Sequence, residues 1–554
     1  MTRLQSSAIL LSIFILFTQI PVCAQSLPVI KHVQFKKDSF NIVKYGAVPG
    51  GIALNTKSIN AAIAACNKKG GGTVIIPAGL WLSGPIVLKT NTNLYLADNA
   101  LLQFTTDFNE YALVEGNWEG VPAVRNQSPL SASNAENIAI TGNGIIDGGG
   151  DAWRAVKKEK LTESQWKRLT VSGGLVSEDK KTWYPTEKSF KGFQTKDAGI
   201  LKDGKTAKDF EDIKDFLRPN LLVLTKCKKI LLEGVTFQNS PAWCLHPLMC
   251  EDLTVRKVYV KNPWYAQNGD GIDIESCKNV LLENNTFDVG DDGICIKSGR
   301  DAEGRKRAMP TENVIVRKCI VYHAHGGFVI GSEMSGGARN LFVSDCSFIG
   351  TDIGLRFKTT RGRGGVIEKI YIRNINMKDI AGEAILFDMY YMAKDPVPLA
   401  GEKRELPKTE FKPVDETTPV FKDFHISNVY CSSAAKAIFI RGLPEMHVKD
   451  IVLEDMVLQA DKGIDIQEAE NIQFKNITVI AADNNPVIDL VQSNHILFDN
   501  IICKKGAEVL LRASGDRVKK INVINTGTLA IKEKSVTELG ADVNEIKFTV
   551  RGGR

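Results

Sequence analysis

Short segments that alternate apolar and variable residues recur along most of the chain, and each begins with a small residue. Aligned on that residue, the first set comprises Gly271–Glu275, Gly293–Lys297, Gly327–Gly331, Gly354–Lys358, Ala384–Asp388, Ala437–Arg441 and Gly463–Gln467. A second set follows in register: Lys229–Glu233, Asn279–Glu283, Asn313–Arg317, Lys369–Arg373 and Asn471–Lys475. Alternation with period two predicts strands with one buried face.

The spacing of these segments indicates how the strands stack. Gly271 and Gly293 are 22 residues apart, other spacings run from 26 to 34, and one gap of 53 separates Ala384 from Ala437. Such a period accommodates about three short strands with turns and no helix. A leucine-rich repeat lacks its sequence register here, and the Asn-Gly or Asp-Gly turns of antiparallel hairpins are mostly absent. We therefore predict an all-β fold, a right-handed parallel β-helix.

The rest of the chain fits this plan with three additions. Residues 58–68 form a short amphipathic pattern that predicts a helix capping the open end of the core. From 152 to 217 the strand pattern breaks and lysines become frequent, which indicates a long insertion. A second insertion, 393–419, carries five prolines. We expect residues 25–554 to form a single catalytic domain.

The first 24 residues have the pattern of a signal peptide. Arg3 precedes an apolar run from Ala8 to Ile20, and we expect cleavage after Ala24. Cys23 leaves a bacterial lipid anchor as the alternative, although the preceding Val22 is larger than such sites prefer. The run is too short to span a membrane comfortably, and no second candidate follows. The protein is expected to be exported, to the periplasm or outside the cell.

Composition narrows the functional classes. The chain has 554 residues, 43% of them hydrophobic, and a net charge of only +6, which gives no indication of nucleic-acid binding. The ten cysteines after Cys23 are scattered, and several recur once per repeat, so we expect most to be buried free thiols rather than disulfides. We expect a monomer that requires no cofactor or metal.

Candidate chemistry lies on two adjacent repeats. Asp270 and Asp292 each directly precede the aligned glycine, one period apart, and Asp291 lies beside Asp292. Stacked strands would place the backbones of Asp270 and Asp292 roughly 4.7–4.9 Å apart. The flanking Gly290 and Gly293 make a bend plausible, which would let both neighbouring aspartates project the same way. Clustered carboxylates cannot all ionise cheaply, so one should keep its proton near neutral pH. An inverting glycosidase needs such an acid and a carboxylate base roughly 6.5–9.5 Å apart.

The next repeats add cationic groups. His325 comes just before the following aligned glycine, and Arg356 and Lys358 occupy the two outward positions of Gly354–Lys358. Two cations beside a carboxylate trio could bind a negatively charged sugar acid, with the arginine able to do so through two hydrogen bonds. Other charged residues on the same face, Asp273, Glu275, Lys297 and Arg300, are interpreted as solvated or ladder charges, and Trp243 as part of the core.

These motifs resemble those of glycoside hydrolase family 28, the polygalacturonases, over about residues 40–525. The family's motifs Asn-Thr-Asp, Gly-Asp-Asp, Gly-His-Gly, Arg-Ile-Lys and a later Tyr correspond to Asn268–Asp270, Gly290–Asp292, Ala324–Gly326, Arg356–Lys358 and Tyr391. The resemblance implies Asp291 as general acid, Asp270 with Asp292 as the groups that activate water, and His325 as a tuner of the acid. It further implies substrate binding by Asn268, Arg356, Lys358 and Tyr391, the last preferred over its neighbour Tyr390. The departures are Gly269, Ala324 and Phe357.

The resemblance implies an inverting hydrolase of α-1,4-galacturonosyl linkages in pectin. Because the two insertions bracket the motifs along the chain, they could close one end of the cleft, so we expect exo-attack that releases monomer or dimer from the non-reducing end. Two alternatives stay open. A pectate-lyase-type β-helix enzyme would need calcium and a cationic base, and a non-catalytic carbohydrate-binding β-helix would bind without forming new reducing ends.

Overall fold

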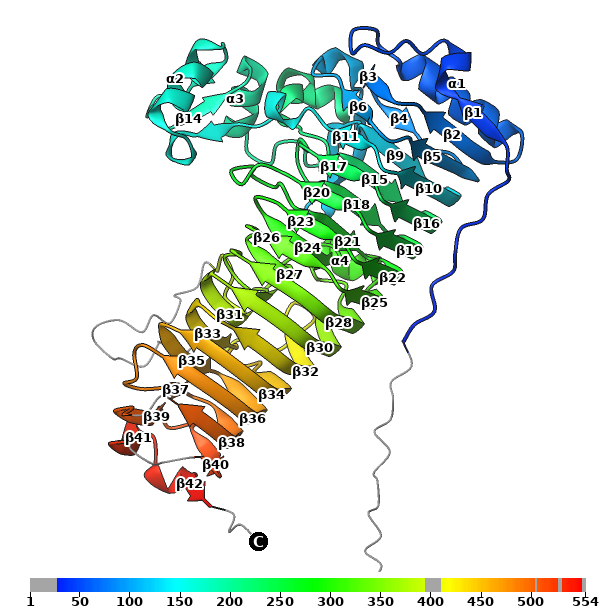
Figure 1. Ribbon diagram of the computed structural model, residues 1–554. Helices are drawn as coiled ribbons and strands as arrows, with labels where there is room; N and C mark the ends of the chain where they lie inside the picture. Colours follow the sequence, from blue (N-terminus) through cyan, green and yellow to red (C-terminus); the bar gives the residue numbers. More distant parts are fainter. Residues whose placement is uncertain (1–26, 203, 394–409, 504–505, 527–530, 551–554) are drawn as a thin grey trace, which may run out of the picture.

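The computed structural model describes residues 27–202, 204–393, 410–503, 506–526 and 531–550, which form a parallel β-helix (Figure 1). The coils stack from β1 near one end of the molecule to β42 near the other. The expected signal peptide, its cleavage site and Cys23 lie outside the described residues. No helix among the described residues is long and apolar enough to cross a membrane.

One face of the solenoid, called sheet B here, carries fourteen parallel strands. In sheet order these are β4 (Ile86–Val87), β9 (Leu130–Ser133), β15 (Leu222–Thr225), β18 (Leu245–Leu248), β21 (Ile272–Glu275), β24 (Asp292–Lys297), β27 (Gly326–Ile330), β29 (Leu355–Lys358), β31 (Ile380–Asp388), β33 (Ala434–Arg441), β35 (Lys462–Gln467), β37 (Ile488–Val491), β39 (Val509–Ser514) and β41 (Glu533–Glu538). The seven segments aligned in the sequence are the neighbours β21 to β35, which confirms the predicted register.

The remaining faces form a 23-stranded parallel sheet, sheet A. Its strands are β1 (Ser39–Asn41), β2 (Gly72–Ile76), β3 (Gly79–Ser83), β5 (Thr92–Leu96), β6 (Ala100–Phe104), β10 (Glu136–Gly142), β11 (Ile145–Asp147), β16 (Lys228–Glu233), β17 (Thr236–Gln238), β19 (Glu251–Arg256), β20 (Tyr259–Lys261), β22 (Lys278–Glu283), β23 (Thr286–Asp288), β25 (Thr311–Arg317), β26 (Ile320–Tyr322), β28 (Ala338–Ile349), β30 (Val366–Lys378), β32 (Val420–Cys431), β34 (Val448–Ala460), β36 (Ala469–Ala481), β38 (Asn494–Cys503), β40 (Lys519–Ile524) and β42 (Ile546–Thr549). From β28 onward one long strand replaces two short ones, since β28 pairs with both β25 and β26. The expected three strands per coil therefore become two.

The core is a set of apolar stacks that run along the solenoid axis. Ile272, Ile294, Phe328 and Leu355 are opposite one another on neighbouring strands and are fully buried. Burying one such side chain contributes about 1.5–3 kcal/mol. The ten cysteines from Cys66 to Cys503 are free thiols, nine of them buried, as the sequence predicted.

A helix closes the N-terminal end of the core. Helix α1 (Thr56–Lys68) buries Ile59, Ala62, Ile63 and Cys66, which recur at helical spacing, and it contacts β1, β2 and β4. This confirms the predicted capping helix. The described residues also contain the short helices η1 (Ile42–Tyr45), η2 (Phe108–Glu110), η6 (Val543–Glu545) and α4 (Asp301–Arg307).

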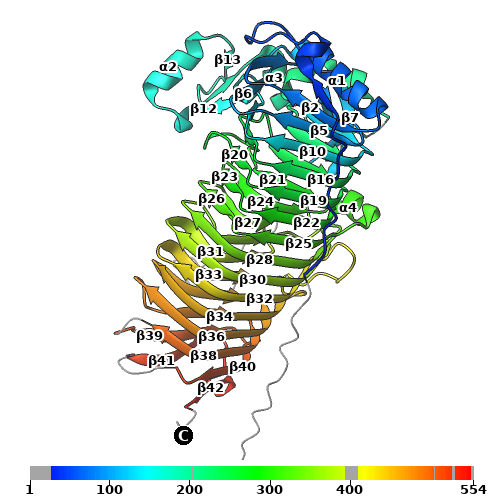
Figure 2. The same cartoon turned by 45° about the vertical axis from the view of Figure 1, so that its right-hand side comes forward.

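The region expected as the first insertion folds into short elements of its own. They are η3 (Gly150–Ala152), β12 (Val156–Lys157), η4 (Lys158–Lys160), α2 (Glu163–Val171), β13 (Leu175–Val176), β14 (Thr182–Tyr184), α3 (Glu187–Gln194) and η5 (Ala207–Phe216). The three strands form a small antiparallel sheet. Helix α2 and its neighbours project sideways from the N-terminal coils (Figures 1 and 2).

A β-hairpin that the sequence analysis missed packs on this insertion. Strands β7 (Leu113–Trp118) and β8 (Val121–Asn126) pair antiparallel across a two-residue turn, Glu119-Gly120, with positive φ at both residues. That geometry matches the twist of a tight hairpin. At its base, Val124 packs with Phe210, Ile213 and Leu217 of the insertion.

Most of the second expected insertion, residues 394–409, lies outside the described residues. In the described remainder, the carbonyl of Thr417 accepts hydrogen bonds from the backbone N–H groups of Gly362 (3.1 Å) and Gly364 (2.8 Å). This part of the insertion is thus attached to the loop that follows β29.

Candidate active site

Five consecutive strands of sheet B bring the expected site residues together. Asp270 directly precedes Gly271 and β21, Asp292 begins β24, and His325 directly precedes β27. Arg356 and Lys358 lie on β29, and Tyr391 follows β31. Because the strands are parallel and in register, residues some 120 positions apart in sequence meet on one side of the solenoid.

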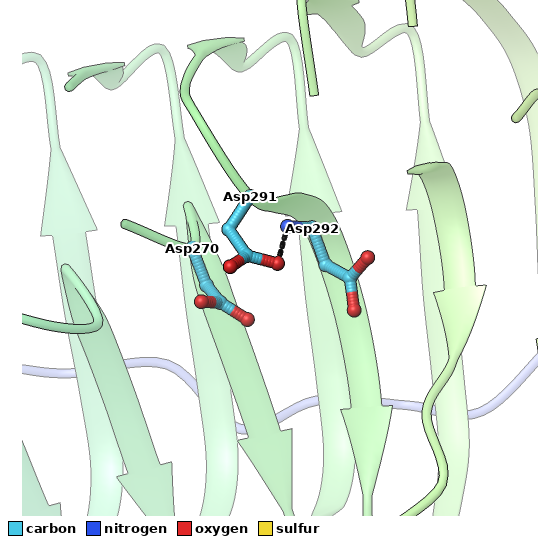
Figure 3. A group of neighbouring side chains, drawn as sticks. All are labelled: Asp270, Asp291 and Asp292. Carbon is cyan, nitrogen blue, oxygen red and sulfur yellow. Dashed lines mark hydrogen bonds between the residues drawn. The ribbon is translucent and has the colours of Figure 1, made fainter. Parts of the chain in front are cut away.

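The three aspartates lie together at the start of β21 and β24 (Figure 3). One oxygen of each carboxylate lies within 4.8 Å of one oxygen of each of the others. This is closer than the roughly 6.5–9.5 Å expected between the acid and base of an inverting enzyme. Asp270 and Asp292 are 3% and 2% exposed, whereas the side chain of Asp291 is 22% exposed.

Asp292 is held as an anion. Lys358 donates to its Oδ2 at 2.7 Å, and Arg356 approaches its Oδ1 at 3.4 Å. Burial alone would raise the pKa of Asp292, but the charges of Lys358 and Arg356 lower it far below its usual range. Both cations therefore face a carboxylate of the protein.

The pKa of Asp270 is shifted in the opposite direction to that of Asp292. Burial, together with the negative charges of Asp273 and Asp291, raises the pKa of Asp270 well above its usual range. Its Oδ1 is buried without a hydrogen-bond partner among the described residues. One of the three carboxyls was expected to stay protonated, and the raised pKa of Asp270 favours the neutral form of that residue.

The carboxylate of Asp291 is surrounded by hydrogen-bonding groups. Its Oδ2 accepts from the backbone N–H of Asn268 at 3.1 Å, and its Oδ1 accepts from the N–H of Asp292 at 3.0 Å. Nδ1 of His325 lies 3.2 Å from the same Oδ1, and this hydrogen bond raises the pKa of the imidazole. The expected pairing of His325 with this aspartate is thus present in the geometry.

The glycines around the aspartates act through close approach. A Cβ on Gly290 would lie 2.5 Å from the carbonyl oxygen of Pro263, and one on Gly293 would lie 2.4 Å from Val321. Neither glycine has a positive φ. Glycine flexibility was expected to allow the bend, whereas these positions require glycine because neighbouring atoms leave no room for a side chain.

Tyr391 and Tyr390 lie in different places. The ring of Tyr391 is 4.9 Å from Nζ of Lys358 and 5.7 Å from the guanidinium of Arg356. Tyr390 instead contacts the guanidinium groups of Arg361 and Arg441. The geometry therefore places Tyr391, and not its neighbour, beside the two cations that contact Asp292.

Three of the four residues interpreted from sequence as solvated or ladder charges are not solvated. Asp273 and Glu275 are fully buried, and Lys297 is 5% exposed, so the interpretation was wrong for these three. Lys297 lies 3.4 Å from Asp273 and 3.1 Å from Glu333, while Arg300 pairs with Glu119. Burial raises the pKa of Asp273 to about 8 even though Lys297 opposes the shift.

Trp243 is buried, but it does not belong to the apolar core inside the coils. Its ring lies 4.4 Å from Nζ of Lys297 and stacks on Trp118 at 5.9 Å. Since Leu245 pairs with Ile272, Trp243 corresponds to Asp270 on the preceding coil. The coil before Asp270 thus has a tryptophan where the next coil has a catalytic candidate, which the sequence alone did not indicate.

Arg218 is a neighbour of the site that sequence reasoning missed. It donates to Oδ1 of Asn268 at 2.9 Å and to the carbonyl of Gln267 at 2.9 Å, and thereby fixes the turn that contacts Asp291. Burial, assisted by Arg154, lowers the pKa of Arg218 to about 10. Arg218 lies where the coils resume after an insertion, and no sequence motif there indicated its contact with the site.

The same three aspartates are the carboxylates that could hold a metal ion, if one bound here. Two observations weaken the fit. Asp292 is already neutralised by Lys358 and Arg356, and the raised pKa of Asp270 favours its neutral form. Hard cations such as Ca²⁺ prefer several ionised oxygens.

Comparison with known proteins agrees with this geometry. The model of glycosyl hydrolases family 28 matches residues 199–419. A probable polygalacturonase of Vitis vinifera is 29% identical over 62% of this chain and 62% of its own length, so less than two thirds of that relative is spanned. An exo-poly-alpha-D-galacturonosidase of Dickeya chrysanthemi is 26% identical over 79% of this chain and 70% of its own.

Solved structures show the same fold. The exopolygalacturonase of Thermotoga maritima superimposes with a TM-score of 0.65 at 29% identity, covering 81% of this chain and 93% of that one. The family 28 exopolygalacturonase of Yersinia enterocolitica gives 0.62 at 22% identity, covering 84% of this chain and 78% of that one. The family match, these relatives and the shared β-helix all support the resemblance of this chain to glycosyl hydrolases family 28.

Proposed function

We propose that the protein hydrolyses the α-1,4-galacturonosyl linkages of polygalacturonate. The observation that carries the proposal is the convergence of Asp270, Asp291 and Asp292 beside Arg356 and Lys358 on one face of sheet B. The trio supplies groups for acid and base work, and the cations and Tyr391 supply contacts for a sugar acid. The polygalacturonase relatives support the choice of substrate.

The roles follow from exposure and partners. Asp291 is the most exposed of the three carboxyls, which favours it as the acid that reaches the leaving oxygen. Asp292, kept ionised by Lys358, is suited to accept a proton from water, with Asp270 beside it. General acid–base catalysis of this kind contributes about 10²–10⁴-fold in rate.

Inversion at the anomeric carbon is part of the proposal, and it rests on the family resemblance rather than on spacing. The compact trio would hold water beside Asp270 and Asp292 instead of across a wide gap. NMR of the first product formed from a galacturonate oligomer tests this directly, because the α-linkage should yield the β-anomer. Accumulation of the α-anomer would contradict inversion.

We further propose exo-attack, with the β7–β8 hairpin as the end wall. Its tip crosses sheet B: Trp118 stacks on Trp243, Glu119 pairs with Arg300 at 3.2 Å, and the N–H of Arg300 donates to the carbonyl of Gly120. Arg300 follows β24, the strand that begins at Asp292. The tip thus contacts the coil before Asp270 through Trp243 and the coil of Asp292 through Arg300.

The expected insertion supports this wall from behind. Ala123 of the hairpin pairs with Ile200, and the N–H of Val124 donates to the carbonyl of Gly199 at 2.7 Å. A chain end abutting the hairpin would be cut near its terminus. Early products decide the matter: monomer or dimer indicates exo-attack, whereas a spread of oligomers with a rapid fall in viscosity indicates endo-attack.

The hairpin assignment has its own test. The double substitution Trp118→Ala with Arg300→Ala removes two contacts of the tip and should lengthen the early products. Arg339→Ala, which removes a surface ion pair with Glu312 on sheet A, is the matched control. Unchanged product lengths in the double variant would exclude the hairpin as the end wall.

Incubation with polygalacturonate tests the reaction class. Hydrolysis produces new reducing ends without ultraviolet absorbance, and a lyase produces both because its product carries a double bond. Binding without new reducing ends would indicate a carbohydrate-binding protein. The proposal predicts the first result, and either of the others would refute it.

A further inference from the structure

A large cavity lies on the outer face of sheet B, on the coils that precede the aspartates. Its volume is about 880 Å³, within the range of sites for organic ligands. Strands β4, β9, β15 and β18 contribute its floor, the β7–β8 hairpin forms one wall, and α4 contributes another. None of the expected catalytic or substrate-binding residues lines it.

One residue in the cavity wall has an unbalanced charge. Arg125 is 8% exposed, and its guanidinium stacks on the ring of Trp118 at 3.3 Å. Among the described residues it has no ion pair and no side-chain hydrogen bond, and its Nε is buried without a partner. The nearby carboxylate, Glu119, pairs with Arg300 instead.

Buried charges in proteins are normally paired, because removing an ion from water without a counter-ion costs several kcal/mol. The nearby guanidinium of Arg218 adds repulsion, and the charge of Glu119, which compensates it in part, is already paired with Arg300. A buried arginine that lines a cavity without a carboxylate partner therefore indicates that the cavity receives an anionic ligand. Arginine binds carboxylates well because its planar fork matches both oxygens.

The rest of the lining includes groups that can bind a polyhydroxylated ligand, together with the exposed carboxylates Glu115 and Glu303. Lys226 and Lys306 are exposed at the cavity without an ion pair among the described residues. Ser131 and Ser133 project from β9, and Gln127 lies beside them. Hydroxyl and amide groups of this kind can pair with the hydroxyls of a sugar.

The cavity is separated from the aspartates. Trp118 lines it, and the stack of Trp118 on Trp243 lies on the coil that precedes Asp270. Trp243 itself does not line the cavity. A ligand here would therefore be held behind the hairpin tip rather than at the point of cleavage.

We propose that this cavity is a second, non-catalytic site for a uronic-acid saccharide, whose carboxylate pairs with Arg125. The choice of a uronic acid rests on the proposed function, while the anionic character of the ligand rests on Arg125 alone. The site binds independently of the catalytic cleft. It would retain an acidic oligosaccharide, a product or a second polymer chain, beside the enzyme.

Calorimetric titration with trigalacturonate tests the proposal in an Asp291→Asn background, where cutting is blocked. Two binding events are expected. Ser131→Trp, which fills the cavity floor, should abolish one event and leave the other unchanged. Ser427→Trp, at a half-buried serine of β32 outside the cavity, is the matched control and should retain both.

Arg125→Gln tests the role of the carboxylate. It should abolish the same event as Ser131→Trp, and a neutral galactose trimer should not produce that event in any variant. A single event that Ser131→Trp leaves unchanged would overturn the proposal. A single event that Ser131→Trp weakens would overturn the independence of the two sites, because one chain would then occupy both.

Failure of the proposed hydrolase is visible separately. Reducing ends are measured on the unmodified protein, and their absence would refute the catalytic proposal. The titration would still report whether an acidic saccharide enters the cavity, since binding there does not depend on cleavage.

Discussion

Removal of the Lys358 ammonium should destabilise the protein far more than removal of a surface lysine. Nζ of Lys358 lies 2.7 Å from Oδ2 of Asp292, and the two side chains are 7% and 2% exposed. At an effective dielectric constant of about 20, their attraction is about 6 kcal/mol, which offsets the desolvation of both ions. Breaking such a pair typically costs about 3–5 kcal/mol. Arg356 stays 3.4 Å from Asp292, so we expect Lys358→Met to cost about 3 kcal/mol, at the lower end of that range.

The assay is urea unfolding at neutral pH with a matched control. Lys532→Met breaks a pair with Glu508 at 3.2 Å, but those side chains are 72% and 46% exposed. Its expected cost is under about 1 kcal/mol. Because removal of both charges of a buried pair is often nearly neutral, Lys358→Met with Asp292→Asn should recover most of the loss.

The dependence on pH follows from the sign of the shift. The lowered pKa of Asp292 means that its contribution is present above the unfolded value of about 3.9 and is lost as pH falls through the folded value. The deficit of Lys358→Met should therefore shrink below about pH 4, where the carboxyl can take up a proton. Equal losses in Lys358→Met and Lys532→Met, or additive losses in the double variant, would refute the reasoning.

Four further outcomes are expected. His325→Gln should lower the melting temperature at pH 5–6 but not at pH 9, because the raised pKa of His325 gives stability that is present below about 6.5 and lost as pH rises through the folded value. Asp273→Asn should raise the melting temperature more at pH 8 than at pH 5, since the pKa of Asp273 is raised to about 8 and its proton stabilises the fold at the lower pH; an equal shift at both values would contradict this. Arg356→Ala should weaken binding of galacturonate oligomers but not of their methyl esters, and equal cutting of both substrates by the parent protein would argue against a carboxylate contact. A chelator should leave activity unchanged, and loss of activity that Ca²⁺ restores would favour the lyase alternative.

The fold was predictable because the repeat is short and its core positions are regular. Gly271, Gly293 and Gly327 occupy the same position on successive coils. The apolar residues that follow them are buried in the core inside the coils. Asp270 and Asp292 precede two of these marks, so their proximity followed from the register alone. Alignment of a repeat thus gave both the architecture and the location of the carboxylates.

What the alignment missed depends on loops that lie outside the repeat. An outward position on a strand was expected to face solvent, yet Asp273 and Lys297 are buried. Lys297 lies against Trp243, on which Trp118 of the hairpin stacks. The hairpin itself has a Glu119-Gly120 turn and no strong signal in its strands. The burial of Arg125 depends on the tertiary packing of the hairpin, which the repeat pattern does not encode.

The most direct measurement compares the unmodified protein with Asp291→Asn on polygalacturonate, counting new reducing ends. The account predicts steady release by the unmodified protein and a rate about 10²–10⁴-fold lower in the variant. Each tenfold loss corresponds to about 1.4 kcal/mol of transition-state stabilisation. Titration with trigalacturonate should show that the variant still binds. Near-normal turnover in Asp291→Asn would contradict the assignment of the acid, and no release by the unmodified protein would contradict the account as a whole.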